Sequence, residues 1–301
     1  MSHCTLCPRQ CPGDRAKAEG FCHTGDEAEV ASIALHRGEE PALAGARGIC
    51  NVFFAHCNLQ CVYCQNHEIS RREVAGEKIF YRTDADIISR IEEVLEESEQ
   101  VVGFVSPTHY AHRVAAIVEA LHRRGRRPTV VYNTNCYDSI ETLRMVEPYV
   151  DIYLPDLKYS DAGLAARYSH AADYPERARE ALLEMVRQRG TGLLTDEEGL
   201  AFRGIIIRHL ILPGQLQNTF DTLDWIADNI GTRVHLSLMG QYNPPQAMEA
   251  VDELGRRLTQ EEYDAAAAHC EQLGFAHGWL QSLEAADCYC PDFSKKDSFE
   301  Q

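Results

Sequence analysis

The sequence predicts an α/β protein in which a parallel β-sheet is covered by helices. From residue 49 onward, short apolar runs alternate with amphipathic helical stretches, which is typical of repeated strand–helix units. The runs are short and apolar, as expected of parallel strands with helices on the sheet faces. The pattern fits a barrel or partial barrel as well as an open doubly wound sheet, and periodicity does not distinguish between them.

The first predicted strand covers residues 49–55, and a cysteine-rich loop follows its C-terminal end. A helix is expected at residues 84–97, where Thr83 or Asp84 is a suitable N-cap. A long helical stretch is expected to break near Tyr174 and Pro175. The remaining strands are predicted at residues 101–105, 129–132, 150–154, 204–212, 233–239 and 275–280, and the remaining helices at residues 110–124, 138–147, 162–189, 219–229 and 259–273.

The chain divides into three parts by composition. Residues 1–48 are rich in Cys, Pro, Gly and charge, and we expect a metal-binding extension there because the segment lacks apolar residues for a core of its own. Residues 49–285 carry the strand–helix pattern. Residues 286–301 form a polar tail, which is expected to be frayed beyond Asp292.

Composition also limits the partners. The chain of 301 residues has a net charge of −17, which disfavours bulk binding to nucleic acid or to an anionic membrane. No apolar run approaches the roughly 18 residues that span a bilayer. The N-terminus lacks the basic and apolar regions of a signal peptide. We therefore expect a cytoplasmic protein without a membrane association.

Twelve cysteines are many for a cytoplasmic protein, where disulfides are disfavoured and clustered cysteines more often bind metals or do redox chemistry. Cys288 and Cys290 are one residue apart, which makes a poor chelate, so we expect surface thiols there. Small buried thiols are expected at the isolated positions, which are Cys50, Cys136 and Cys270.

Three cysteines lie in one short loop, with the spacing Cys57-x3-Cys61-x2-Cys64. Three thiolates can hold a [4Fe–4S] cluster and leave one iron open to bind a ligand, since such a cluster usually takes four cysteines. The alternative is a zinc site closed by His56 or His67. Both interpretations stay open on the loop alone, although the ligand type favours the cluster.

A second group of cysteines lies in the N-terminal extension, with the spacing Cys4-x2-Cys7-x3-Cys11-x10-Cys22. Four closely spaced thiolates suit a closed site for zinc or for a second iron–sulfur cluster. Three hypotheses follow for this group: a structural clip for a segment without a core, an electron-relay cluster, and plain thiols.

Polar side chains follow several predicted strands at their C-terminal ends, where barrels and open α/β sheets both place their active sites. Asn133, Thr134 and Asn135 follow one of these strands, and their side chains can hydrogen-bond a ribose or a carboxylate. Asp156 and Lys158 can balance the two charges of a zwitterion. Arg208 lies within an apolar strand and needs a partner, either a bound carboxylate or Asp156, because an isolated buried charge is very costly.

Taken together, these motifs resemble the pyruvate formate-lyase activating enzyme branch of the radical S-adenosylmethionine (SAM) enzymes. The whole chain is similar to a group of uncharacterised homologues of those activating enzymes. The cysteine loop and the segment 156–158 are the most specific parts of the resemblance. The matching stretches are residues 4–11, 57–66, 106–109, 132–135, 151–159, 208–214 and 238–244.

The resemblance implies a partial (β/α)6 barrel in which SAM chelates the open iron of a [4Fe–4S] cluster on Cys57, Cys61 and Cys64. One electron, from a flavodoxin or ferredoxin, would cleave SAM to methionine and a 5′-deoxyadenosyl radical. That radical would abstract hydrogen from a substrate, with the backbone glycine of a glycyl-radical enzyme as the first candidate and another peptide or a small metabolite as alternatives. The rival hypothesis is a non-catalytic iron–sulfur or metal scaffold.

The resemblance also assigns the cofactor-binding residues, which are Tyr63, Ser106, Thr108, Asn133, Thr134, Asp156, Lys158 and Arg208. Tyr63 would pack beside the adenine, and Ser106 or Thr108 would bind the SAM amino group. Asn133, Thr134 and Asp156 would lie by the SAM carboxylate, where the activating enzymes hold a monovalent cation. Lys158 and Arg208 would face SAM. Asn133 stands where those enzymes have an aspartate, and Gln241 where they have a histidine.

Overall fold

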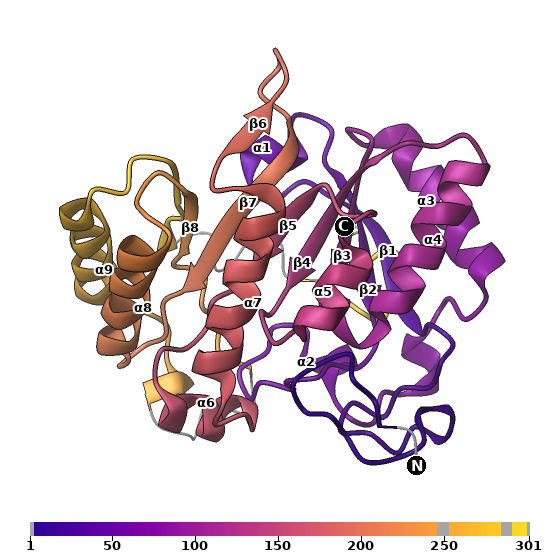
Figure 1. The fold of residues 1–301 in the computed structure, drawn as a ribbon, viewed down its shortest axis with the longest axis horizontal. Helices are drawn as coiled ribbons and strands as arrows, with labels where there is room; N and C mark the ends of the chain where they lie inside the picture. The colour runs from indigo at the N-terminus through magenta and orange to yellow at the C-terminus, as the bar shows by residue number, and fades with distance from the viewer. Residues whose placement is uncertain (1–2, 246–252, 284–290, 300–301) are drawn as a thin grey trace.

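The computed structural model describes residues 3–245, 253–283 and 291–299. Its centre is a nine-stranded sheet (Figure 1) with the strand order β1-β2-β3-β4-β5-β7-β8-β9, in which β6 pairs with β7 beside this path. β1 is antiparallel to β2, β6 is antiparallel to β7, and the other pairs are parallel. The strands are β1 (Val30–His36), β2 (Ile49–Phe54), β3 (Val101–Val105), β4 (Thr129–Thr134), β5 (Ile152–Pro155), β6 (Leu193–Thr195), β7 (Ala201–Leu210), β8 (His235–Met239) and β9 (Gly278–Leu280).

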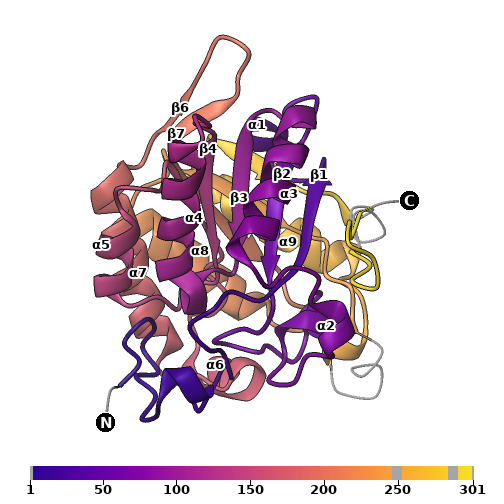
Figure 2. The same ribbon diagram turned by 90° about the vertical axis from the view of Figure 1, so that its right-hand side faces the viewer.

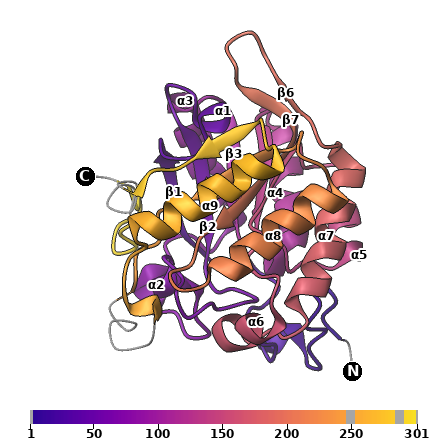
Figure 3. The same ribbon diagram turned by 90° about the vertical axis from the view of Figure 1, so that its left-hand side faces the viewer.

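The helices alternate with these strands, and α8 and α9 pack side by side (Figure 3). β1 and β9 end the strand path without pairing with each other in the described part of the chain, so the sheet stays open. The predicted α/β fold with an incomplete barrel of parallel strands is therefore confirmed. The helices are α1 (Pro41–Ala44), α2 (His67–Ser70), α3 (Asp84–Glu97), α4 (Ala111–Arg123), α5 (Ile140–Val146), α6 (Ala162–Ser169), α7 (Tyr174–Arg189), α8 (Leu216–Asn229) and α9 (Gln260–Leu273).

Local signals in the sequence fix several helix ends. Thr83 caps α3, because its side chain accepts a hydrogen bond from the backbone N–H of Asp86. The predicted break in the long helical stretch separates α6 from α7: His170 adopts a left-handed conformation, and Pro175 lies in the first turn of α7. Apolar faces of α3 and α4 pack with β2 and β3 into one buried cluster, which fixes this part of the sheet.

Two segments differ from the expectations. β1 lies inside the segment predicted as the N-terminal extension, and it was missed because its Ala and Ser residues have weak β-propensity. The tail is not frayed over residues 291–299, since Phe293 is buried against Phe53 and the Ser32 hydroxyl donates to the carbonyl oxygen of Lys296. Cys288 and Cys290 lie outside the described residues.

The N-terminal segment before β1 contains only one short 3-10 turn, Arg15–Lys17, among its described residues. Figure 2 shows it at the same end of the molecule as α2, which follows the C-terminal end of β2. This end of a parallel sheet is where α/β proteins place their active sites. No helix in the described ranges combines the length and the apolar composition that a bilayer-spanning segment requires.

Gly103 in the middle of β3 is expected to be intolerant of a side chain. It pairs with Asn51 of β2, and a Cβ atom there would collide with the Asn51 side chain, which donates a 2.9 Å hydrogen bond to Glu39. We expect Gly103→Ala to lower the free energy of unfolding by about 1–3 kcal/mol, as other overpacked cores do. Urea unfolding measures this, with Gly192→Ala as the control because nothing lies within 4 Å of a Cβ there. Equal stability of the two variants would contradict the prediction.

Candidate functional site

One pocket collects most of the predicted site residues at the C-terminal ends of the parallel strands. The three cysteines of the loop after β2 line it together with Ser106 after β3, and side chains from the ends of β4, β5 and β7 complete the wall. Tyr63 also lines it, and its hydroxyl accepts a 2.8 Å hydrogen bond from Tyr159. The predicted residues in this wall are Cys57, Cys61, Tyr63, Cys64, Ser106, Asn133, Asp156, Lys158 and Arg208.

The cysteine loop is held by backbone contacts from elsewhere in the fold. The N–H of Val62 donates to the carbonyl oxygen of Tyr168 at 2.8 Å. The Arg71 guanidinium donates to the carbonyl oxygens of Gln60 and Val62, at 3.0 and 3.3 Å. Gln60 adopts a positive φ of 54°, which helps the loop to turn tightly. The positions of the three thiols are therefore fixed by the scaffold and not by each other.

Hydrogen-bond donors point at two of the sulfur atoms. The Ser169 hydroxyl donates to Cys61 Sγ at 2.9 Å, and Asn135 Nδ2 donates to Cys57 Sγ at 3.5 Å. Burial raises the pKa of both thiols, that of Cys61 to about 12. A bound metal would offset this cost of the thiolate form, and hydrogen bonds to sulfur tune iron–sulfur centres. Sequence reasoning missed Ser169 because it lies on α6, far along the chain from the loop.

The histidines offered for a zinc site do not complete one. Both ring nitrogens of His56 are engaged, Nε2 with Glu29 at 3.0 Å and Nδ1 with the carbonyl oxygen of Arg71 at 3.1 Å. His67 is exposed and does not line the pocket. Within the described ranges, no three His, Cys, Asp or Glu side chains stand where they could hold one metal ion. In a cubane cluster each thiolate binds a different iron. The cysteines of a cluster therefore need not converge on one point, as the ligands of a single metal ion must.

Arg208 is the centre of a buried group of charges beside the cysteines. Its guanidinium donates to Asp156 at 2.7 Å, to Asn133 at 2.8 Å and to Glu39 at 3.2 Å. Glu40 lies 3.8 Å from the same guanidinium. Asp156, one of the two partners predicted for Arg208, is therefore in contact with it. Glu39 and Glu40 precede α1 and were missed, since 169 positions separate Glu39 from Arg208.

The charge states in this group follow from burial and pairing. Burial raises the pKa of Asp156, but Arg208 and Lys158 lower it more, so the carboxyl is held below its ordinary value. Burial lowers the pKa of Lys158, but the Asp156 carboxylate raises it more, to about 12. Burial and the neighbouring Glu39 raise the pKa of Glu40. Lys158 gives one of its three ammonium donors to Asp156, at 3.0 Å, at the wall of the pocket.

Two predicted residues are not in this pocket. The Thr108 hydroxyl donates to the Asp138 carboxylate at 2.8 Å, and the Thr134 hydroxyl donates to the other oxygen of the same carboxylate. Both threonines are fully buried. They stabilise a buried carboxylate, which otherwise would carry a large desolvation cost. These two hydroxyls contact Asp138 and their residues do not line the pocket, whereas Asn135, the third polar side chain after the same strand as Thr134, does.

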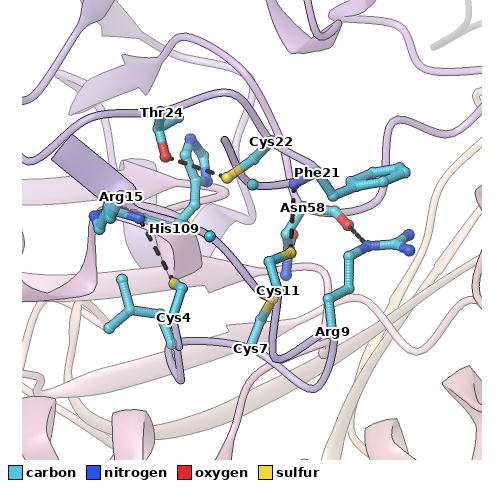
Figure 4. Close-up of a pocket in the computed structure, with 13 residues that line it drawn as sticks. Cys4, Cys7, Arg9, Cys11, Arg15, Phe21, Cys22, Thr24, Asn58 and His109 are labelled. Atoms are coloured by element: carbon cyan, nitrogen blue, oxygen red, sulfur yellow. Dashed lines mark hydrogen bonds between the residues drawn. The ribbon is translucent and has the colours of Figure 1, made fainter. Parts of the chain in front are cut away.

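The four N-terminal cysteines line a second pocket (Figure 4). This pocket shares Asn58 with the cysteine loop, since Asn58 lines it and follows Cys57 directly. The three isolated cysteines, Cys50, Cys136 and Cys270, are buried thiols as predicted.

Residues 51–226 match the model of the Radical SAM superfamily. The chain belongs to the radical SAM superfamily. Members of this superfamily are enzymes that use a [4Fe–4S] cluster and SAM, so the family implies both cofactors for this enzyme. It is 28% identical over 277 residues to the uncharacterized protein MJ0674 of Methanocaldococcus jannaschii, a match that covers 90% of this chain and 75% of that protein.

Solved structures of the same superfamily are also similar to this radical SAM enzyme. Streptococcus suis SuiB shares 14% identity with a TM-score of 0.47, covering 77% of this chain and 49% of SuiB. SuiB bound to S-adenosylmethionine shares 11% identity with a TM-score of 0.49, covering 79% and 48%. A domain of pyruvate-formate lyase-activating enzyme from Bacteroides vulgatus shares 12% identity with a TM-score of 0.41, covering 57% and 93%. The chain spans about half the length of the SuiB chains.

Proposed function

We propose that Cys57, Cys61 and Cys64 hold the [4Fe–4S] cluster of this enzyme and that SAM binds beside it in the same pocket. The observation that supports this is that the three thiols share one pocket with the buried charges of Asp156 and Lys158. When bound, the cluster supplies one electron to SAM, which breaks into methionine and a 5′-deoxyadenosyl radical. The scaffold alternative has no use for charged side chains around a three-cysteine loop.

The residues around the loop would bind and orient SAM. The remaining donors of Lys158 suit the SAM carboxylate, and Asp156 suits its amino group. Asn133 and Asp156 both accept from Arg208, so this guanidinium takes the place of the monovalent cation expected by resemblance. Tyr63 would pack beside the adenine, and Ser106 lies at the wall where the amino group would bind.

The substrate is proposed from the sequence resemblance alone. The first candidate is the backbone glycine of a glycyl-radical enzyme, which would lose a hydrogen atom to the 5′-deoxyadenosyl radical. Another peptide or a small metabolite is the alternative, because fold does not fix substrate. The electron would come from a flavodoxin or a ferredoxin. A glycyl-radical signal in electron paramagnetic resonance (EPR) after mixing with such an enzyme would favour the first candidate, and 5′-deoxyadenosine without that signal would favour the alternatives.

The proposed reaction is tested by its product. The protein is reconstituted anaerobically with iron and sulfide, reduced with dithionite and mixed with SAM, and 5′-deoxyadenosine is measured by mass spectrometry. We expect 5′-deoxyadenosine only when the cluster, dithionite and SAM are all present. A protein that takes up zinc at the loop in preference to a cluster, and that does not bind SAM, would contradict the proposal.

The hydrogen bond from Ser169 to Cys61 Sγ is expected to tune the cluster. A donor stabilises the more negative, reduced cluster, so Ser169→Ala should lower its midpoint potential. The fall is expected to reach about 40 mV, which for one electron corresponds to a hydrogen bond of about 1 kcal/mol. EPR-monitored titration measures it, with Ser160→Ala as the control because Ser160 pairs with Thr222 and not with sulfur. An unchanged potential in Ser169→Ala would show that the bond does not act on the cluster.

A further inference from the structure

The proposed function leaves the pocket of the N-terminal cysteines unexplained. Figure 4 shows the sulfur atoms of Cys4, Cys7, Cys11 and Cys22 around one common space. The Phe21 N–H donates to Cys11 Sγ at 3.3 Å. The Arg15 guanidinium lies 3.9 Å from Cys4 Sγ, within the range of a hydrogen bond to sulfur. Such donors are the contacts that iron–sulfur centres receive from their protein.

Side-chain contacts of Arg9 attach the segment to the barrel. The Arg9 guanidinium donates to the carbonyl oxygens of Asn58, Ser169 and His170, at 2.6, 3.1 and 3.0 Å. The same guanidinium stacks on the Phe21 ring at 3.5 Å. These contacts fix the segment against the barrel through a side chain that is not one of the four cysteines.

The attachment sites of Arg9 lie next to the candidate SAM site. Asn58 follows Cys57, and its Oδ1 accepts a 2.8 Å hydrogen bond from the same Asn135 amide that donates to Cys57 Sγ. Ser169 donates to Cys61 Sγ. Arg9, which lines the N-terminal pocket, therefore binds the backbone of Ser169, the donor to Cys61 Sγ, and of Asn58, which contacts the donor to Cys57 Sγ.

We propose that Cys4, Cys7, Cys11 and Cys22 hold a second [4Fe–4S] cluster that passes electrons to the cluster on the cysteine loop. This rests on the proposed function, since the loop cluster is the acceptor. Four thiolates close such a cluster, so no iron is open to SAM.

The electron balance of the relay is simple. A flavodoxin or ferredoxin gives one electron to the N-terminal cluster and is oxidised. The N-terminal cluster passes that electron on and returns to its oxidised state, and the loop cluster is reduced by one electron. No proton or further reactant is needed. Asn58 lines the N-terminal pocket and directly follows Cys57, which lines the other pocket, so the two sites are neighbours in the fold.

The cluster on the N-terminal cysteines is tested in a variant that lacks the cluster on the cysteine loop. The variant Cys57→Ala/Cys61→Ala/Cys64→Ala, purified anaerobically and reconstituted, is analysed for iron, sulfide and zinc. We expect about four irons and about four sulfides per chain, compared with about eight of each in the wild type. Its reduced EPR signal should not change when SAM is added. A variant without iron, or with one zinc, would overturn the second cluster.

The complementary variant Cys4→Ala/Cys11→Ala separates the two proposals. It should retain about four irons, and its EPR signal should change with SAM. A signal that ignores SAM would count against the proposed function, whereas the iron in the triple variant decides the second cluster independently. Cys270→Ala is the control, since this buried thiol lies on α9 and lines neither pocket.

The relay itself is tested with two reductants. Dithionite is small and should reduce the loop cluster directly in the Cys4→Ala/Cys11→Ala variant. Reduced flavodoxin should reduce the loop cluster in the wild type, and this reduction should be lost in the variant. Reduction of the variant by flavodoxin at the wild-type rate would overturn the relay.

Discussion

Cys61→Ala is expected to abolish both the SAM-responsive cluster and the formation of 5′-deoxyadenosine. Cys61 is buried, and its sulfur accepts the Ser169 hydrogen bond at the wall of the pocket. The loop would retain two thiols, too few for a stable cluster with one open iron. The measurement is 5′-deoxyadenosine formed anaerobically with dithionite and SAM, together with the EPR response to SAM.

The matched control for Cys61→Ala is Cys270→Ala. Cys270 is also buried, but it lies on α9 and does not line the pocket, so product formation should stay near the wild-type level. Product formation by Cys61→Ala at the wild-type level would refute the assignment of this thiol to the cluster. Loss of product in both variants would point to a general effect on folding.

Arg208→Gln is expected to be among the most destabilising single changes in the chain. The guanidinium joins Asp156, Glu39 and Glu40, and all four side chains are largely buried. Removing it leaves Glu39 and Glu40 without the guanidinium that they share, and Asp156 with Lys158 alone of its two cations. Breaking a buried ion pair in this way costs about 3–5 kcal/mol, so the free energy of unfolding in urea should fall by that amount.

Arg177→Gln is the control for this effect. Arg177 lies on α7 and pairs with Asp173 and Glu180 on the surface. Exposed pairs contribute about 0–1 kcal/mol, so this variant should unfold close to the wild type. Similar losses in both variants would refute the claim that Arg208 supports a buried network.

The cost of Arg208→Gln should also depend on pH. Although burial raises the pKa of Asp156, Arg208 and Lys158 hold it below its ordinary value in the folded protein. A depressed folded pKa stabilises the protein above the unfolded pKa, and this contribution is lost as pH falls through the folded value. Without Arg208 the pKa rises and protonation relieves the repulsion. The stability difference between wild type and variant should therefore be largest near neutral pH and shrink on acidification.

The periodicity of apolar residues and the spacing of the cysteines were enough to predict the parallel sheet and the position of the three-cysteine loop. The alternation of apolar runs and helical stretches predicted the parallel sheet, because strands and helices each impose their own side-chain period. The spacing of Cys57, Cys61 and Cys64 predicted a three-thiol loop directly after β2, since all three lie within a few residues of one strand end. The polar residues Asp156 and Lys158 were expected at the same edge because parallel strands end together.

The tertiary structure decided which side chains contact one another across the fold. Arg208 forms ion pairs with Glu39 and Glu40, and Thr108 donates a hydrogen bond to Asp138. In each case the partners come from segments that are distant in sequence. The N-terminal cysteines lie beside the cysteine loop because Arg9 binds carbonyl oxygens of the barrel. The local sequence pattern indicates that a buried cation or hydroxyl needs a polar partner, because removing such a group from water is costly. Which partner it takes depends on how the chain packs, and only the folded structure specifies that.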